Sequence, residues 1–174
     1  AGLSVTGDRL AILTNGGGAG VLAVDALEAR GGRLAELSKD TLGALGAIAS
    51  ANWSRRNPVD ILGDAQPDIY EKAMAVLVGA AEVDAVLVMN CPVAVADSTE
   101  AARAVIRATP TGVHRKPVIA CWLGDTAVGP GRRLLSEAGL PSAEAPDEAL
   151  RAVMHLVDHH RNQTLLLQTP ATAA

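Results

Sequence analysis

The sequence has no phenylalanine, two tryptophans and one tyrosine, so aromatic residues make up only 2% of its 174 residues. So few rings argue against a surface that stacks on several bases or sugars. A basic excess is also lacking, because 15 lysines and arginines face 19 acidic residues, and we therefore expect no nucleic acid partner. No apolar run reaches the roughly 18 residues of a membrane span, and no secretory leader is visible. We expect a cytoplasmic protein without a membrane partner.

Cysteine is equally scarce. Cys91 and Cys121 each end an apolar run and form no CxxC pair, and two cysteines are too few for a disulfide framework, so we expect both to be reduced. The apolar fraction is nevertheless 49%, which suffices for one domain with a sizeable aliphatic core.

Short apolar segments alternate with helical patterns along the chain. The expected strands cover residues 10–14, 33–37, 84–89, 117–122 and 142–145. The expected helices follow the glycines at 15–20, then begin near residues 38, 67, 97, 128 and 147. This alternation predicts an α/β fold, a flavodoxin-like three-layer sandwich with a parallel sheet of about five strands in the order 2-1-3-4-5. We expect the domain to span residues 7–163, with 1–6 and 164–174 as tails or linkers to missing domains.

Three loops are candidates for chemistry at the carboxyl edge of this sheet. The first runs from Asn15 to Gly20 and places glycines between a strand and a helix, where backbone N–H groups and the helix dipole favour an anion. Its spacing is neither a convincing dinucleotide fingerprint nor a Walker A loop. The alternative is a tight crossover without a ligand.

The other two loops are the polar segment from Arg55 to Ala65 and the turn that follows Asn90. A loop as long as the first of these usually has a function. Alternatively, Asp60 and Asp64 cap the next helix or bridge the two arginines. The turn after Asn90 has the alternative of a proline-stiffened connection in which Cys91 is a small buried residue.

The four histidines give little information. His155 and His159 share a helix face at a spacing that could hold a metal, but no Glu or Cys completes a ligand set. We therefore interpret them as a solvated helix end and expect no metal site. His114 receives no role.

Taken together, residues 12–18, the Asn-Pro-Val-Asp-Ile-Leu-Gly-Asp-Ala segment at 57–65 and the Arg-Asn-Gln segment at 161–163 resemble the nucleoside-diphosphate-forming acyl-CoA synthetases. This is the ADP-forming acetyl-CoA synthetase group. The resemblance covers about residues 7–170. It points to one domain of these enzymes, similar to the C-terminal domain of the succinyl-CoA synthetase beta subunit, which also has a flavodoxin-like fold.

The resemblance implies acyl-phosphate chemistry, in which ATP phosphorylates a histidine, the phosphoryl group passes to a carboxylate and CoA displaces it. It also implies that a helix N-terminus of this domain helps to hold the phosphohistidine. The implied phosphate or acyl-phosphate-binding residues are Asn15, Gly16, Gly17, Gly18, Asn57, Cys91, Pro92, Val93 and Ala94.

The chain departs from whole synthetases. The family's phosphorylated histidine lies in a Ser-His-Thr-Gly or Gly-His-Ala-Gly motif that is absent here, and no ATP-grasp or CoA-binding segment is present. We therefore expect a domain without catalytic residues or a cofactor of its own, inactive alone. Its parent would use ATP, Mg²⁺ and CoA through ATP-grasp, CoA-binding and phosphohistidine domains. The alternatives are an acyl-CoA-sensing domain joined to a protein lysine acetyltransferase domain, and a pure interaction domain.

Overall fold

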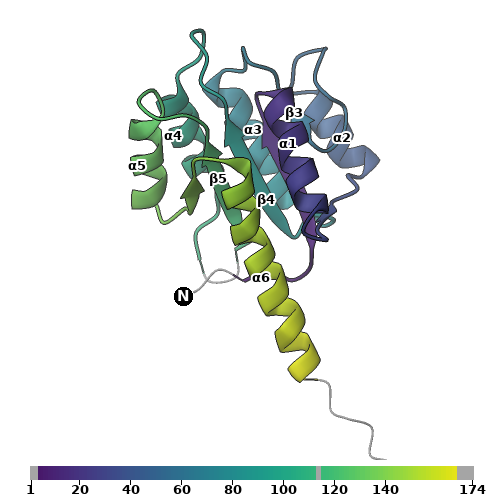
Figure 1. Ribbon diagram of the computed structural model, residues 1–174. Coiled ribbons are helices and arrows are strands. Elements are labelled where there is room, and N and C mark those ends of the chain that lie inside the picture. The colour runs from purple at the N-terminus through teal and green to yellow at the C-terminus, as the bar shows by residue number, and fades with distance from the viewer. Residues whose placement is uncertain (1–3, 113–114, 168–174) are drawn as a thin grey trace, which may run out of the picture.

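The first strand, β1 (Arg9–Thr14), lies inside a parallel sheet in a computed structural model that describes residues 4–112 and 115–167. The sheet order is β2-β1-β4-β5-β6, and β3 pairs with β1 as well. Figure 1 shows β4 and β5 side by side between the helices. The other strands are β2 (Arg33–Leu34), β3 (Val59–Asp60), β4 (Ala85–Asn90), β5 (Val118–Trp122) and β6 (Ser142–Ala143). The predicted α/β class and strand order are confirmed, and β3 is an addition that the sequence pattern does not predict.

Helices cover both faces of this sheet. One face carries α1 (Gly17–Glu28) and α6 (Pro146–Leu166), which pack against each other. The opposite face carries α2 (Lys39–Gly46), α3 (Pro67–Gly79), α4 (Ser98–Ala108) and α5 (Gly129–Glu137). The result is the predicted three-layer sandwich.

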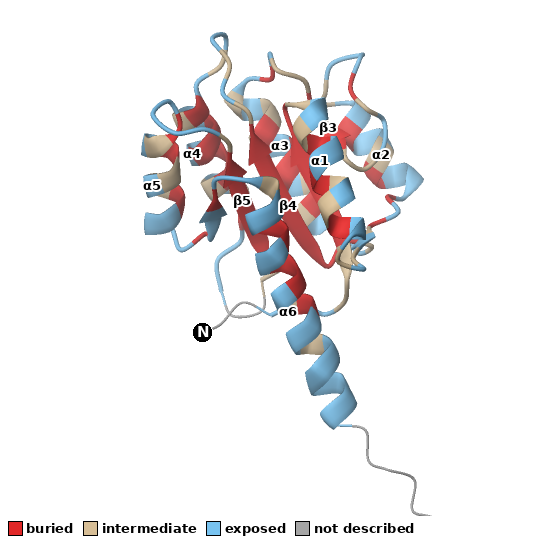
Figure 2. Cartoon of the chain, viewed as in Figure 1, coloured by how far each residue is buried: buried red, intermediate tan, exposed pale blue. Residues whose placement is uncertain are grey.

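The two cores follow from the alternation of side chains along each strand. In β1, Leu10 and Ile12 face α1 and α6, whereas Ala11 and Leu13 face the other helix layer. All six residues of β4 are buried, as expected for a central strand covered on both faces. Figure 2 shows this burial concentrated in the strands and on the inner helix faces.

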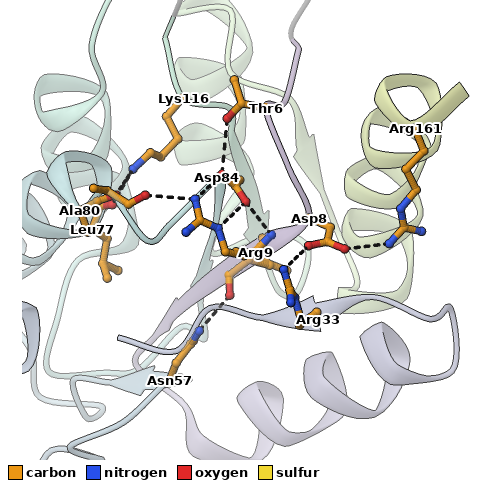
Figure 3. A network of polar contacts seen from close by, with 12 residues as sticks. Thr6, Asp8, Arg9, Arg33, Asn57, Leu77, Ala80, Asp84, Lys116 and Arg161 are labelled. Carbon is orange, nitrogen blue, oxygen red and sulfur yellow. Dashed lines mark hydrogen bonds and ion pairs between the residues drawn. The ribbon is translucent and has the colours of Figure 1, made fainter. Parts of the chain in front are cut away.

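Ion pairs fasten the amino edge of the sheet (Figure 3). Arg9 forms two hydrogen bonds of 2.8 Å to the carboxylate of Asp84, which is only 6% exposed. Hydrogen bonds from Arg9 lower the pKa of Asp84. Asp8 accepts from Arg33 at 2.8 Å and from Arg161 at 2.9 Å. Burial alone would raise the pKa of Asp8, but these two arginines lower it. The network joins β1, β2, β4 and α6 at the edge opposite the candidate loops.

The limits of the domain differ slightly from those expected. Val5 lies in the segment predicted as a tail and is buried in the core beneath α1 and α6. α6 continues to Leu166 rather than ending near residue 163. Residues 1–3, 113–114 and 168–174 lie outside the described residues, and His114 is among them. The linker role of both ends stays a prediction. None of the described helices is long and apolar enough to span a membrane.

Candidate functional site

The N-terminus of α1 begins within the glycine segment itself. Gly16 is the N-cap in an extended conformation, and the first helical hydrogen bond runs from the Gly20 N–H to the Gly16 carbonyl at 3.0 Å. In the part of the chain that the structure describes, the N–H groups of Gly17, Gly18 and Ala19 have no acceptor. Gly17 and Gly18 are exposed. α1 thus starts directly after a strand with N–H groups that are unpaired within the described residues, and the predicted anion contact there stays a prediction.

Asn15 joins the first and third predicted loops. Its side-chain Nδ2 donates to the Cys91 carbonyl at 2.9 Å, and its Oδ1 accepts from the Cys91 N–H at 2.7 Å. Asn15 is 4% exposed, so this pair of bonds fixes the turn after β4 against the turn after β1. A β-carbon at Gly16 would lie 2.6 Å from the Cys91 sulfur, so a larger residue there would displace the Cys91 side chain.

The third loop folds back on itself over the same edge. Val93 and Ala96 form an isolated antiparallel bridge, while Pro92 and Ala94 are exposed. Burial, with a smaller contribution from the charge of Asp60, raises the pKa of the half-buried Cys91 thiol. A thiol with a raised pKa is a poor nucleophile at neutral pH.

Asn57 also lines the cavity that Gly17 lines. Its side chain, however, forms hydrogen bonds with the backbone of neighbouring strand segments. Its Oδ1 accepts from the Ile12 N–H at 2.9 Å, and its Nδ2 donates to the carbonyls of Leu10 and Ala35 at 2.8 and 3.0 Å. The Asn57 amide thus continues the β1–β2 ladder where β2 ends. It occupies the stretch of β1 between the residues that pair with β2 and those that pair with β3. Its predicted phosphate contact stays a prediction.

Among the described residues, Asp60 neither caps the next helix nor pairs with an arginine, which were the two alternatives for this residue. α3 is capped at Gln66 without a side-chain bond, and no ion pair in the described part of the chain involves Asp60. Instead, Asp60 Oδ1 accepts from the Leu62 N–H at 2.9 Å. A β-carbon built on Gly17 would lie 2.7 Å from Asp60 Oδ2. The second carboxylate oxygen therefore points to the start of α1, which the sequence alone does not reveal.

A buried polar pair supports the end of β4 from beneath. Asn90 Nδ2 donates to the Tyr70 hydroxyl at 3.0 Å, which donates to the Met89 carbonyl at 3.1 Å. Burial raises the pKa of Tyr70 far above its usual range, so this hydroxyl stays protonated. These residues are not among the predicted site residues, because each resembles an ordinary core position in the sequence.

The histidines lie elsewhere. His155 and His159 are exposed on α6, and no group of three potential metal-ligating side chains occurs among residues 4–112 and 115–167.

Comparisons with known proteins place this geometry in context. The family model of the Ligase-CoA domain matches residues 10–161. The chain is 35% identical over 145 residues to ADP-forming acetate–CoA ligase I of Archaeoglobus fulgidus, a match that covers 83% of this chain and 20% of that protein. It is 33% identical over 159 residues to the alpha subunit of ADP-forming acetate–CoA ligase II of Pyrococcus furiosus, covering 90% of this chain and 35% of that subunit.

A solved structure agrees with these relatives. The dinucleotide-forming acetyl-coenzyme A synthetase 1 of Ca. Korarchaeum cryptofilum, in complex with phosphate and ADP, superposes with a TM-score of 0.90 and 26% identity over 98% of this chain and 37% of that one. The chain thus spans about a fifth to a third of the relatives it matches. With most of its length matched by the family model, the chain belongs to the Ligase-CoA domain family.

Proposed function

We propose that this chain is one domain of an ADP-forming acyl-CoA synthetase and that its α1 N-terminus holds a phosphoryl group during acyl-CoA formation. The observation that carries the proposal is the set of free N–H groups at Gly17, Gly18 and Ala19, at the switch point between β1 and β4. In parallel α/β sheets, ligands bind at this point, outside the carboxyl ends of the strands. The ligand would be a phosphohistidine or an acyl phosphate.

The geometry suits such a group. Three N–H donors, unpaired within the described chain, and the positive end of the helix dipole lie beside the Cys91 turn, which Asn15 holds in place, with the Asp60 carboxylate at the Gly17 end. Small side chains at Gly16 to Ala19 let a tetrahedral anion approach the backbone closely. Because a few exposed donors act alone in this domain, we expect inorganic phosphate to bind with a Kd of roughly 1 mM, about −4 kcal/mol.

The rest of the reaction would belong to other domains of the parent protein. An ATP-grasp domain would supply the nucleotide and Mg²⁺, a second domain the CoA, and a third the phosphorylated histidine. The relatives named above are ligases, which favours this parent over the acetyltransferase alternative. Incubated with ATP, Mg²⁺, acetate and CoA, the chain alone should release no ADP and gain no phosphohistidine, and robust acetyl-CoA formation would overturn the proposal.

A phosphate titration tests the site directly. Amide proton and nitrogen shifts should move at Gly17, Gly18 and Ala19 on addition of phosphate, but not on addition of chloride at the same ionic strength. A β-carbon at Gly18 has nothing within 4 Å, and proline is tolerated in a first helical turn. G18P removes one donor and should weaken binding several-fold, whereas G18A keeps the donor and should bind as tightly as the wild type. Equal affinity in both variants would refute the site.

A further inference from the structure

A cavity of about 440 Å³ runs along α1 and begins at Gly17, whose N–H is one of the free groups at the helix start. It opens between α1 and the chain from Ser54 to Asp60. Four apolar side chains contribute to its wall: Val21, Val24, Leu34 and Pro58. Val21 is 60% exposed and its neighbour Leu22 is 61% exposed. Of these two, Val21 lines the cavity, so an exposed aliphatic side chain forms part of its wall.

The charges in this groove are mainly negative. Asp60 lies at the end next to Gly17, and Asp25 lies two turns further along α1. Neither forms an ion pair within the described residues. Asp60 keeps one oxygen, Oδ2, without a hydrogen-bond donor from the same residues. Arg56 is the one cationic side chain among the described residues that line the groove, which leaves the groove with a net negative charge.

We propose that this groove receives an arginine side chain from a partner protein, with the guanidinium at Asp60 and the methylene stem against Val21 and Pro58. The groove combines an apolar wall with an unpaired carboxylate, which matches a long side chain with an apolar stem and a cationic head. A guanidinium is more weakly hydrated than an ammonium, so it loses less on entering a half-apolar groove. The proposal does not require phosphate binding, because its contacts are the Asp60 carboxylate and apolar side chains, although the two sites meet at Gly17.

The test uses n-butylguanidinium chloride as the probe and amide shifts as the readout. We expect saturable shifts at residues 17–25 and 54–60, with weaker binding of guanidinium chloride, which lacks the stem. D60N should weaken binding about fivefold, the loss of one partly exposed ion pair. The amide oxygen that D60N introduces can still accept from the Leu62 N–H, so the fold should survive. The matched control is D125N, because Asp125 is a 97% exposed carboxylate after β5, and it should bind like the wild type.

A second variant tests the apolar wall. Val21→Ser changes an exposed position and should leave stability nearly unchanged. It should remove much of the advantage of n-butylguanidinium over guanidinium.

Four results would overturn the proposal. The first is amide shifts outside the groove, and the second is equal affinity of D60N and the wild type for n-butylguanidinium. The third is tighter binding of n-butylammonium than of n-butylguanidinium. The fourth is concentration-dependent self-association that shifts the groove amides without any probe. The last would assign the groove to a second copy of the chain. A failed phosphate titration with a successful cation titration would refute the proposed function alone, and the reverse would refute the groove alone.

Discussion

Asn57→Ala should be among the most damaging single substitutions in this domain. The wild-type amide makes three hydrogen bonds to the backbone of β1 and of the segment after β2. Without this amide, the Ile12 N–H would have no hydrogen-bond partner. Because Ile12 is 0% exposed, leaving this buried donor unpaired costs about 1–3 kcal/mol. The Ala35 carbonyl loses a bond worth about 1 kcal/mol. The Leu10 carbonyl loses less, since it also accepts from the Ala35 N–H.

These contributions sum to a loss of about 3 kcal/mol in the free energy of unfolding. For a domain of this size that corresponds to a fall in Tm of about 6–12 °C. Urea denaturation followed by circular dichroism measures the free energy, and calorimetry measures the Tm. The matched control is Asn52→Ala, an exposed asparagine in the same segment, which should change stability by less than about 0.5 kcal/mol.

Asn57→Asp sharpens the test. Aspartate keeps the acceptor for Ile12 but places a carboxylate oxygen against two carbonyls, so it should destabilise at least as much as alanine. The reasoning fails if N57A costs less than about 1 kcal/mol or if N57D is tolerated. Either outcome would mean that the Asn57 amide does not hold β1 and β2 together.

Other substitutions should separate structural from exposed positions. G16A should destabilise by about 1–3 kcal/mol in urea denaturation because the new methyl group meets the Cys91 sulfur, whereas G18A should stabilise by up to about 1 kcal/mol; equal effects would contradict the loop contact. A hydrogen bond from a backbone N–H lowers the pKa of Glu82 from 4.5 to about 2. Its stabilisation is therefore complete above pH 4.5 and lost as the pH falls through 2, so E82Q should cost most at neutral pH and least near pH 2. In thiol labelling at about pH 8, Cys91 should react slowly, and Cys121, whose pKa burial raises to about 12, should not react until the protein unfolds. Rapid labelling of both would show that the loops open readily.

The sequence predicts long apolar elements well and short paired ones poorly. β4 is predictable because five consecutive apolar residues between two polar ones leave few other structures possible. β3 is not, because Val59–Asp60 has only two residues inside a polar segment. It exists only because β2 ends early and leaves the upper part of β1 unpaired, which is a property of the assembled sheet.

For the candidate site, the position of the loops could be predicted from the sequence, but the contacts of individual side chains could not. Parallel topology alone predicts that the turns after β1 and β4 meet at one edge, and the Asn15–Cys91 contact shows them meeting. The partners of individual side chains could not be predicted. Asn57 precedes a proline, which suggests a turn, yet its amide extends the β1–β2 hydrogen-bond ladder. Asp60 directs one carboxylate oxygen to the start of α1. Both depend on contacts between segments about 45 residues apart.

The ion pair between Asp8 and Arg161 has a practical consequence for handling the molecule. It brings the beginning of β1 and the later turns of α6 to the amino edge, and the ends of the described chain lie on that side (Figure 1). The α1 N-terminus and the groove beside it open toward the carboxyl edge. A fluorophore or a surface tether attached at Ser4 or at Leu167, the first and last described residues, would therefore stand away from both candidate binding sites. Immobilised chains should present those sites to solution in a uniform orientation, which suits the weak titrations described above to surface-based detection.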